Sequence, residues 1–139
     1  IPWASESFRS NADLVNTLLV LIQDENFGVR TQASIALDSY NYDPEIREAL
    51  LNILYNDPET PPRYAAFGTL IEKEPSETLI PILRTVLEGG EEGLIVRALV
   101  ALGEMGPEAK TLKPLAEKYL THNAYGVRQA AQDAISKIG

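Results

Sequence analysis

The sequence predicts an all-α fold, an α-α superhelix (solenoid) of four helical hairpins. The first observation behind this prediction is a pattern that recurs four times with a period of 32 or 33 residues, which is typical of repeat architectures. The second is that apolar residues within each period recur at helical spacing. The third is that no stretch of four or more residues between turn signals alternates in the manner of a β-strand.

The repeats align on one anchor position and on the residues around it. These anchors are Arg30, Arg63, Ile95 and Arg128. In the third repeat, alignment on the small residues that follow the anchor selects Ile95 and leaves Arg97 as a displaced arginine. Small residues three and six positions after the anchor, such as Ala33 and Ala36, predict second helices that approach one another closely.

The extent of the repeat pattern divides the chain into residues 1–11, predicted to be an N-terminal cap or linker, and a repeat domain over residues 12–139. We expect Trp3 and Phe8 either to cover the first unit or to be the remnant of a preceding element. The four predicted units span residues 12–40, 43–73, 76–105 and 107–139.

Each unit is predicted to hold two helices. The first helix of the first unit is indicated by the helical spacing of Leu14, Leu18, Leu21 and Ile22. Capping residues and prolines predict where later helices begin: Asp43-Pro44, Thr60-Pro61, Ser76 and Gly106-Pro107. Short turns between helices are predicted at Asp57-Pro58, Gly89-Gly90 and Asn123.

The composition is that of a folded chain and limits its partners. Hydrophobic residues make up 45% and charged residues 23% of the 139 residues, which argues against disorder. The net charge of −8 argues against nucleic acid, and the longest apolar run, Leu18 to Ile22, is too short for membrane insertion. The chain has no cysteine, which excludes disulfides and cysteine-based sites. It begins at Ile1 rather than Met, so we expect a piece of a longer reading frame.

The repeat resembles the HEAT and HEAT-like (phycobilisome-lyase-type) repeat family from about Ala12 to the end of the chain. The resemblance lies in Asp24, Val29-Arg30, Ala33 and Ala36-Leu37, in the echoes Asp57, Arg63 and Val127-Arg128, and in the first helices Leu79-Ile80-Pro81-Ile82 and Leu112-Lys113-Pro114-Leu115. The period is shorter than the roughly 40–47 residues of long HEAT repeats, so the short HEAT-like class fits better.

The resemblance implies that arginines at the anchors pair with aspartates at the turns and tie adjacent repeats together. The residues given this structural role are Asp24, Arg30, Asp57, Arg63 and Arg128. The alternative role is an arginine rail that binds phosphates. Repeat three departs from the pattern, with Gly89 and Ile95 where an aspartate and an arginine are expected, so its pairing is in doubt.

Stacked hairpins form an extended concave surface that suits the binding of another protein. The side of the second helices expected to face this surface is mainly polar in the first and last repeats and apolar in the middle two. The apolar row consists of Tyr64, Phe67, Ile71, Val96 and Leu99. Two interpretations stay open: the row is a partner-binding hot spot, or it is ordinary core between packed helices. A hot spot predicts that Phe67→Asp abolishes binding and leaves stability nearly intact.

The sequence offers no candidate for catalysis. His122 is the single histidine and lies at a predicted turn, and the carboxylates are scattered. We therefore expect no catalytic residue, no metal site and no cofactor, and a monomeric scaffold that binds an unidentified protein partner.

Three other functions remain as alternatives to a protein-interaction module. Residues 102–110 and 124–128 look like the HEAT-like C-terminal tail of some bacterial sulfatases, which would make the chain a non-catalytic appendage of a larger enzyme. Short HEAT-like repeats also occur in bilin lyases, which would need a groove for a chromophore. HEAT-like DNA glycosylases have a basic groove, which the acidic composition opposes. The sequence favours a cytoplasmic location, or a periplasmic one if the chain is a sulfatase tail.

Overall fold

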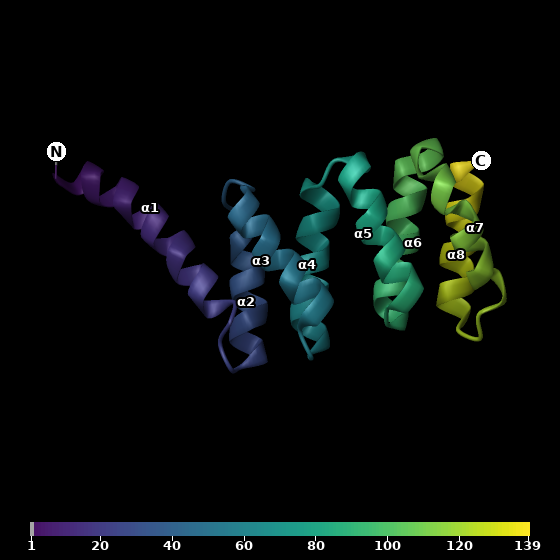
Figure 1. Ribbon diagram of the computed structural model, residues 1–139, viewed down its shortest axis with the longest axis horizontal. Helices are drawn as coiled ribbons and strands as arrows, with labels where there is room; N and C mark the ends of the chain where they lie inside the picture. The colour runs from purple at the N-terminus through teal and green to yellow at the C-terminus, as the bar shows by residue number, and fades with distance from the viewer. Residues whose placement is uncertain (1) are drawn as a thin grey trace. The chain divides into compact units, whose positions relative to one another are not determined.

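The computed structural model describes the backbone of residues 2–139 and the side chains from Ala12 onward. Every regular element within residues 2–139 is helical (Figure 1), which confirms the all-α class. The elements in chain order are α1 (Pro2–Leu21), α2 (Phe27–Leu37), α3 (Pro44–Asn56), α4 (Thr60–Lys73), α5 (Ser76–Gly89), α6 (Glu92–Met105), the 3₁₀ helix η1 (Gly106–Leu112), α7 (Lys113–Glu117), the 3₁₀ helix η2 (Lys118–Thr121) and α8 (Tyr125–Ile138).

The side chains of Trp3 and Phe8, which we expected to cover the first unit, lie outside the described residues. The backbone of Pro2–Leu21 forms one helix, α1, that crosses the predicted boundary between residues 11 and 12. The cap or linker predicted at residues 1–11 is therefore not separated from the first repeat by a break in the helix.

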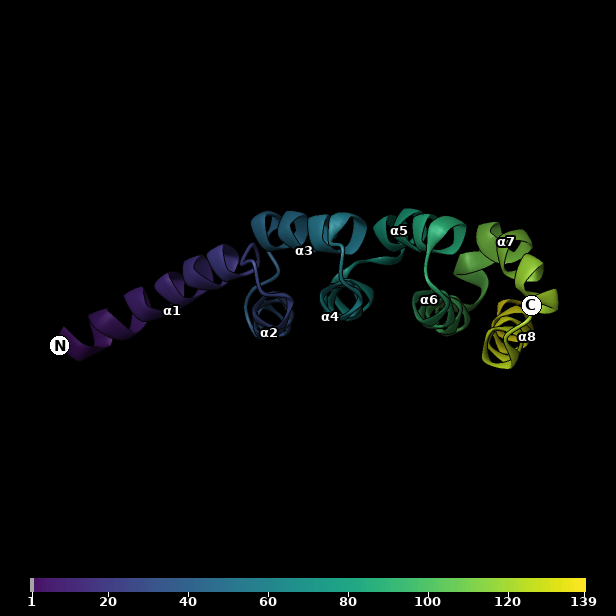
Figure 2. The same ribbon diagram turned by 90° about the horizontal axis from the view of Figure 1, so that it is seen from below.

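The chain divides into two compact units, Ile1–Lys73 and Glu74–Gly139. In the first unit α1 packs against α2, α3 packs against α4, and α2 and α4 contact each other. Figure 2 shows α2 and α4 side by side in one layer and α3 in the other. This unit therefore has two layers of helices, with the second helices of repeats one and two next to each other.

The second unit, Glu74–Gly139, has the same kind of packing. Helix α5 contacts α6, α7 contacts α8, and the most extensive contact is between α6 and α8. Figure 2 places α5 and α7 in one layer and α6 and α8 in the other. The second helices of repeats three and four are thus neighbours within this unit.

Helix starts follow the capping signals of the sequence. Helix α3 begins at Pro44, and the Asp43 side chain accepts a 2.9 Å hydrogen bond from the Ile46 backbone N–H. Helix α2 is capped by Asn26, whose Oδ1 accepts from the Gly28 and Val29 N–H groups. The predicted starts of α4, α5 and η1 agree with the structure.

The first helix of repeat four is a correction to the prediction. We expected one continuous helix, but η1, α7 and η2 divide the segment into three short pieces. Pro114 lies in the first turn of α7, where it can supply no backbone N–H to a carbonyl of the preceding turn. Pro81, at the equivalent position of repeat three, lies inside the continuous helix α5, so the proline alone does not explain the change of helix type in repeat four.

The core of each unit is built from the repeated columns. The residue three positions after each anchor is buried in all four repeats, and these residues are Ala33, Ala66, Ala98 and Ala131. The residue seven positions after the anchor is buried in the first three repeats, and these residues are Leu37, Leu70 and Leu102. Small side chains at the first column allow close helix packing, and large ones at the second fill the space between helices.

Candidate functional site

Arg30 links the first two repeats. Its Nε donates to Asp57 Oδ2 at 2.7 Å, and its Nη2 donates to Asp57 Oδ1 at 3.0 Å. Two parallel N–H···O bonds form the bidentate geometry that suits a planar guanidinium and a carboxylate. Arg30 lies in the first turn of α2 and Asp57 directly follows α3, so the contact joins the start of α2 in repeat one to the turn of repeat two.

The same arginine also holds its own turn. Arg30 Nη1 donates to the carbonyl oxygens of Asp24 and Glu25, at 2.9 and 3.0 Å. Arg128 Nη1 makes the equivalent bonds to the carbonyls of His122 and Asn123, at 2.7 and 2.9 Å. These carbonyls lie near helix ends, where backbone oxygens lack partners within the helix.

Arg63 follows this pattern in the second repeat. Its Nη1 donates to the Asp57 carbonyl at 2.6 Å, and its Nη2 donates to Thr60 Oγ1 at 3.3 Å. All three anchor arginines therefore bind the backbone carbonyl six residues before them. Their common role is to fix the turn within one repeat, and Arg30 adds to this a bidentate link to the next repeat.

The pKa of the Asp57 carboxyl is lower than its ordinary value. Burial alone would raise this pKa, but the hydrogen bonds from Arg30 and from the Glu59 backbone N–H outweigh the effect of burial. Asp57 is thus a carboxylate that is buried, charged and paired, which is the condition under which a buried charge is tolerated.

Repeat three has neither the aspartate nor the arginine, and a tyrosine supplies a link between repeats three and four. The Tyr119 hydroxyl in η2 donates to the carbonyl oxygen of Leu87, in the last turn of α5. Burial raises the pKa of Tyr119, which keeps this hydroxyl protonated as a donor. Tyr119 was not among the residues predicted from the sequence. The other three repeats have Leu21, Leu54 and Val86 at the same position, nine before the anchor, so the hydroxyl of Tyr119 is the signal that distinguishes it.

The residues of the apolar row predicted on the second helices differ in solvent exposure: two are fully buried and three are half-buried. Phe67 on α4 and Leu99 on α6 are each 0% exposed. Tyr64, Ile71 and Val96 are half-buried. The burial of Phe67 and Leu99 favours the interpretation of these two residues as core, because neither side chain offers any surface to a partner.

The apolar surface of the second helices lies one position further along. Ile35 on α2 is 50% exposed and Val100 on α6 is 48% exposed. Both residues stand five positions after their anchors, whereas Phe67 and Leu99 stand four positions after theirs. A step of one residue turns a helix by about 100°, which separates a buried side chain from an exposed one.

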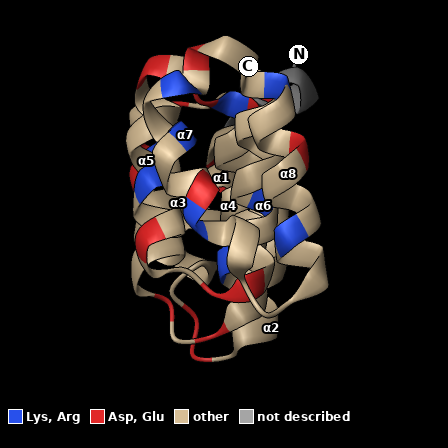
Figure 3. Ribbon diagram, turned by 90° about the vertical axis from the view of Figure 1, so that its right-hand side faces the viewer, with Lys and Arg blue, Asp and Glu red and all other residues tan. Residues whose placement is uncertain are grey.

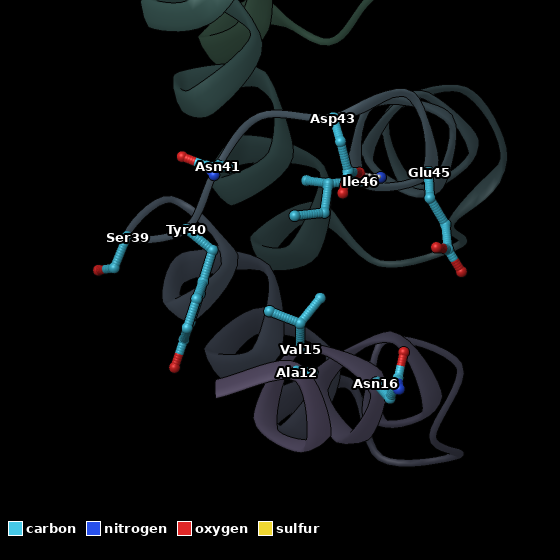
Figure 4. A pocket seen from close by; sticks show the side chains of 9 residues that line it. All are labelled: Ala12, Val15, Asn16, Ser39, Tyr40, Asn41, Asp43, Glu45 and Ile46. Carbon is cyan, nitrogen blue, oxygen red and sulfur yellow. Dashed lines mark hydrogen bonds between the residues drawn. The ribbon is translucent and has the colours of Figure 1, made fainter. Parts of the chain in front are cut away.

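A shallow groove of about 500 Å³ lies between α1, the connection after α2, and α3. Figure 4 shows Val15 and Ile46 pointing into the space between the helices, with polar side chains around them. The Asp43 carboxylate at its edge caps α3. The lining residues are Ala12, Val15, Asn16, Ser39, Tyr40, Asn41, Asp43, Glu45 and Ile46.

Acidic residues surround the turns that Arg30 joins. They are Asp24, Glu25, Asp57 and Glu59. Figure 3 shows red ribbon, which marks acidic residues, in the loops near the start of α2. Glu25 and Glu59 are exposed, so this end of the first unit presents negative charge to solvent.

Metal-ligand clusters and membrane-spanning helices are both absent from the described part of the chain. Within it, no group of three or more His, Cys, Asp and Glu side chains could hold a metal ion. None of its helices has the length and apolar character needed to cross a membrane. His122 takes part in its own turn, where its Nδ1 accepts a 3.0 Å hydrogen bond from the Ala124 N–H.

Neither a protein-family model nor a curated protein matches this chain. The fold class that the structure defines is all-α. Any narrower family therefore has to be proposed from the repeated residues and their contacts.

Proposed function

We propose that this chain is a HEAT-like protein-interaction module that catalyses no reaction itself. Its four hairpins would form a solenoid, and a protein partner would bind the exposed face of the second helices. We name this the second-helix face and define it by Ile35, Tyr64, Ile71, Val96 and Val100.

The exposure of Ile35 and Val100 carries the proposal. Two large aliphatic side chains stay about half exposed at the same position of two different repeats. Single exposed apolar residues are common, but here the same repeat position is apolar and exposed once in each compact unit. In the first unit, half-buried Tyr64 on α4 adds an aromatic side chain to this apolar set.

The chemistry of this face indicates what a partner should present. Aromatic and aliphatic side chains with partial exposure are suited to apolar anchors of a partner. The net charge of −8 would favour association with a basic partner and make the association rate sensitive to salt. The proposed partner is therefore a protein segment with apolar anchors and flanking basic residues.

The test compares variants of the intact chain in affinity capture followed by quantitative mass spectrometry. Ile35→Asp and Val100→Asp place a charge on the second-helix face. Val20→Asp is the control, because Val20 is 72% exposed on α1 and lies outside this face. Circular dichroism checks that all three variants stay folded.

We expect a set of bound proteins shared by the wild type and Val20→Asp, and lost in Ile35→Asp and Val100→Asp. Salt should weaken the capture. If folded Ile35→Asp and Val100→Asp retain the same proteins as the wild type, the second-helix face is not the binding surface.

A further inference from the structure

One side of repeat one corresponds to the side on which later repeats contact the repeat before them. We name it the leading edge and define it by Leu14, Asp24, Val29 and Ala36. Repeats two and four each follow another repeat within the same compact unit, so they show what this edge looks like when it is covered.

The apolar positions of the leading edge are more exposed than their apolar equivalents in repeats two and four. Leu14 is 46% exposed, whereas its equivalent in repeat four, Leu112, is 0% exposed. Val29 is half-buried, whereas its equivalents Pro62 and Val127 are fully buried.

A close approach in the second unit shows which way one of these positions faces. A Cβ atom added to Gly103 of repeat three would lie 3.4 Å from Ala134 Cα of repeat four. The position six after the anchor therefore contacts the preceding repeat. Ala36 holds this position in repeat one, and it is half-buried where Ala134 is buried.

Asp24, the polar residue of the leading edge, also has fewer contacts than its equivalent in repeat two, Asp57. Asp24 Oδ1 accepts a 2.9 Å bond from the N–H two residues later, at Asn26, and Asp57 Oδ1 accepts the same 2.9 Å bond from Glu59. Asp57 additionally receives two bonds from Arg30 of the preceding repeat. Among the described residues, no side chain donates to the Asp24 carboxylate.

From these observations we infer that the leading edge binds a further helical hairpin of the same repeat type, different from the four in this chain. The second helix of that hairpin supplies an arginine to the Asp24 carboxylate, as Arg30 does for Asp57. Small or apolar residues on the same helix cover Val29 and Ala36. This surface is separate from the second-helix face, so the two proposals can fail independently.

The opposite end of the chain does not match this edge. Repeat three presents Leu99 and Gly103 at the positions four and eight after its anchor. Repeat four has Gln132 and Ser136 at these positions, and both are exposed. Gln132 and Ser136 offer no apolar side chain to cover Val29 and Ala36, so a second copy of this chain is not the expected occupant.

The test adds a stand-in hairpin, a copy of repeat one, because its arginine already pairs with the turn aspartate of the repeat that follows it. Residues 10–42 are duplicated in the full chain, so that an extra copy precedes residue 10 and keeps the spacing of 33 residues between anchors. Arg30 of the extra copy then meets Asp24 of the original copy. We expect the five-hairpin chain to unfold in one transition, with a midpoint several degrees above that of the natural chain.

The decisive variant is Asp24→Asn in the original copy, because it keeps the side-chain oxygen of the turn and removes the charge. We expect this change to lower the unfolding midpoint of the five-hairpin chain by roughly 5 °C and that of the natural chain by no more than about 1 °C. Asp13→Asn, at an exposed position of α1, is the control and should change neither. An equal effect of Asp24→Asn in both chains, or separate unfolding of the added hairpin, would overturn the inference.

Sedimentation equilibrium of the natural chain tests whether the leading edge binds a second copy of this chain instead. We expect a monomer across the accessible concentration range. Reversible association that disappears in Arg128→Ala would show that the leading edge takes a second copy of the chain, and would also overturn the inference.

Discussion

At the residue scale, the Arg30 guanidinium serves two neighbouring turns with separate groups of donors. Nη1 binds the carbonyls of its own turn, and Nε and Nη2 bind Asp57 of the next repeat. A lysine could place one ammonium near either turn but could not present this planar set of donors to both. Arginine at this position is therefore explained by geometry as well as by charge.

The lowered pKa of Asp57 leads to a prediction for acid. A carboxyl whose pKa is lower in the folded protein than in the unfolded chain contributes stability above the unfolded value, near 3.8, and this contribution is lost as the pH falls through the folded value. We expect Asp57→Asn to lower the unfolding midpoint at about pH 7, and the difference from the wild type to shrink towards about pH 3.

Thermal unfolding followed by circular dichroism between these pH values tests the prediction. Glu48→Gln is the control, since Glu48 is exposed and makes only a 3.6 Å contact with Arg47. A difference between Asp57→Asn and the wild type that stays constant with pH would show that the Asp57 charge does not stabilise the fold.

Tyr119 gives a second prediction at this scale. Tyr119→Phe removes the hydroxyl that donates to the Leu87 carbonyl and should cost about 1 kcal/mol of unfolding free energy. Tyr125→Phe is the matched control, because Tyr125 is 69% exposed and its ring contact with Arg128 does not need the hydroxyl. Urea unfolding measures both variants, and equal values for the two would contradict the role given to Tyr119.

The resemblance to HEAT-like repeats was sufficient to propose that anchor arginines such as Arg30 pair with turn aspartates such as Asp57. It could not show that Arg63 and Arg128 bind carbonyls of their own turns, since the backbone carries no sequence signal. Tyr119 was missed because it is unique to its repeat, and a comparison among repeats emphasises what recurs.

At the element scale, the rotation of each second helix determines which apolar residues are exposed. The sequence placed Phe67 and Leu99 on the same side as Tyr64 and Val96, and that side is about 100° wide. Neighbouring helices cover part of this width, so Phe67 and Leu99 are buried while Val100 is not. The exposed part depends on helix packing, which the periodicity of one helix does not contain.

Phe67 tests this distinction. Because its side chain is fully buried, Phe67→Ala should cost about 3–5 kcal/mol of unfolding free energy, and Phe67→Asp should leave the first unit unfolded. Ile35→Ala, at a half-exposed position of the neighbouring helix, should cost less than about 1 kcal/mol. Urea unfolding measures all three, and a stable, fully helical Phe67→Asp would restore Phe67 as a surface residue.

At the scale of the whole molecule, the helices and their order were predictable and the division into two units was not. Each helix carries its own apolar period and most carry a capping residue or a proline near the start, so local sequence defines them. The division falls between repeats two and three, next to the repeat that has Gly89 and Ile95 in place of the paired residues. Four similar repeats in sequence gave no reason to expect that the contacts would group in pairs.

The two units predict a local response to mutation. In a protein built of repeats, loss of one link mainly affects its neighbours. We expect Asp57→Asn to speed amide hydrogen exchange in residues 12–73 and to leave residues 74–139 close to the wild-type rates. Hydrogen exchange measured by mass spectrometry makes the comparison, and equal acceleration in both units would indicate that the chain opens as one cooperative body.

The broken first helix of repeat four also has a consequence for how the chain would be degraded. Short 3₁₀ segments have weaker hydrogen-bond geometry than an α-helix, so the backbone of η1 and η2 should open more readily than that of α5 or α6. Lys110 and Lys118 lie exposed in these segments, where trypsin can reach them. A single cut there would leave α8 held to α6 by packing alone, and its dissociation would uncover the face of α6 that it packs against, so turnover of the protein is expected to begin in the second unit.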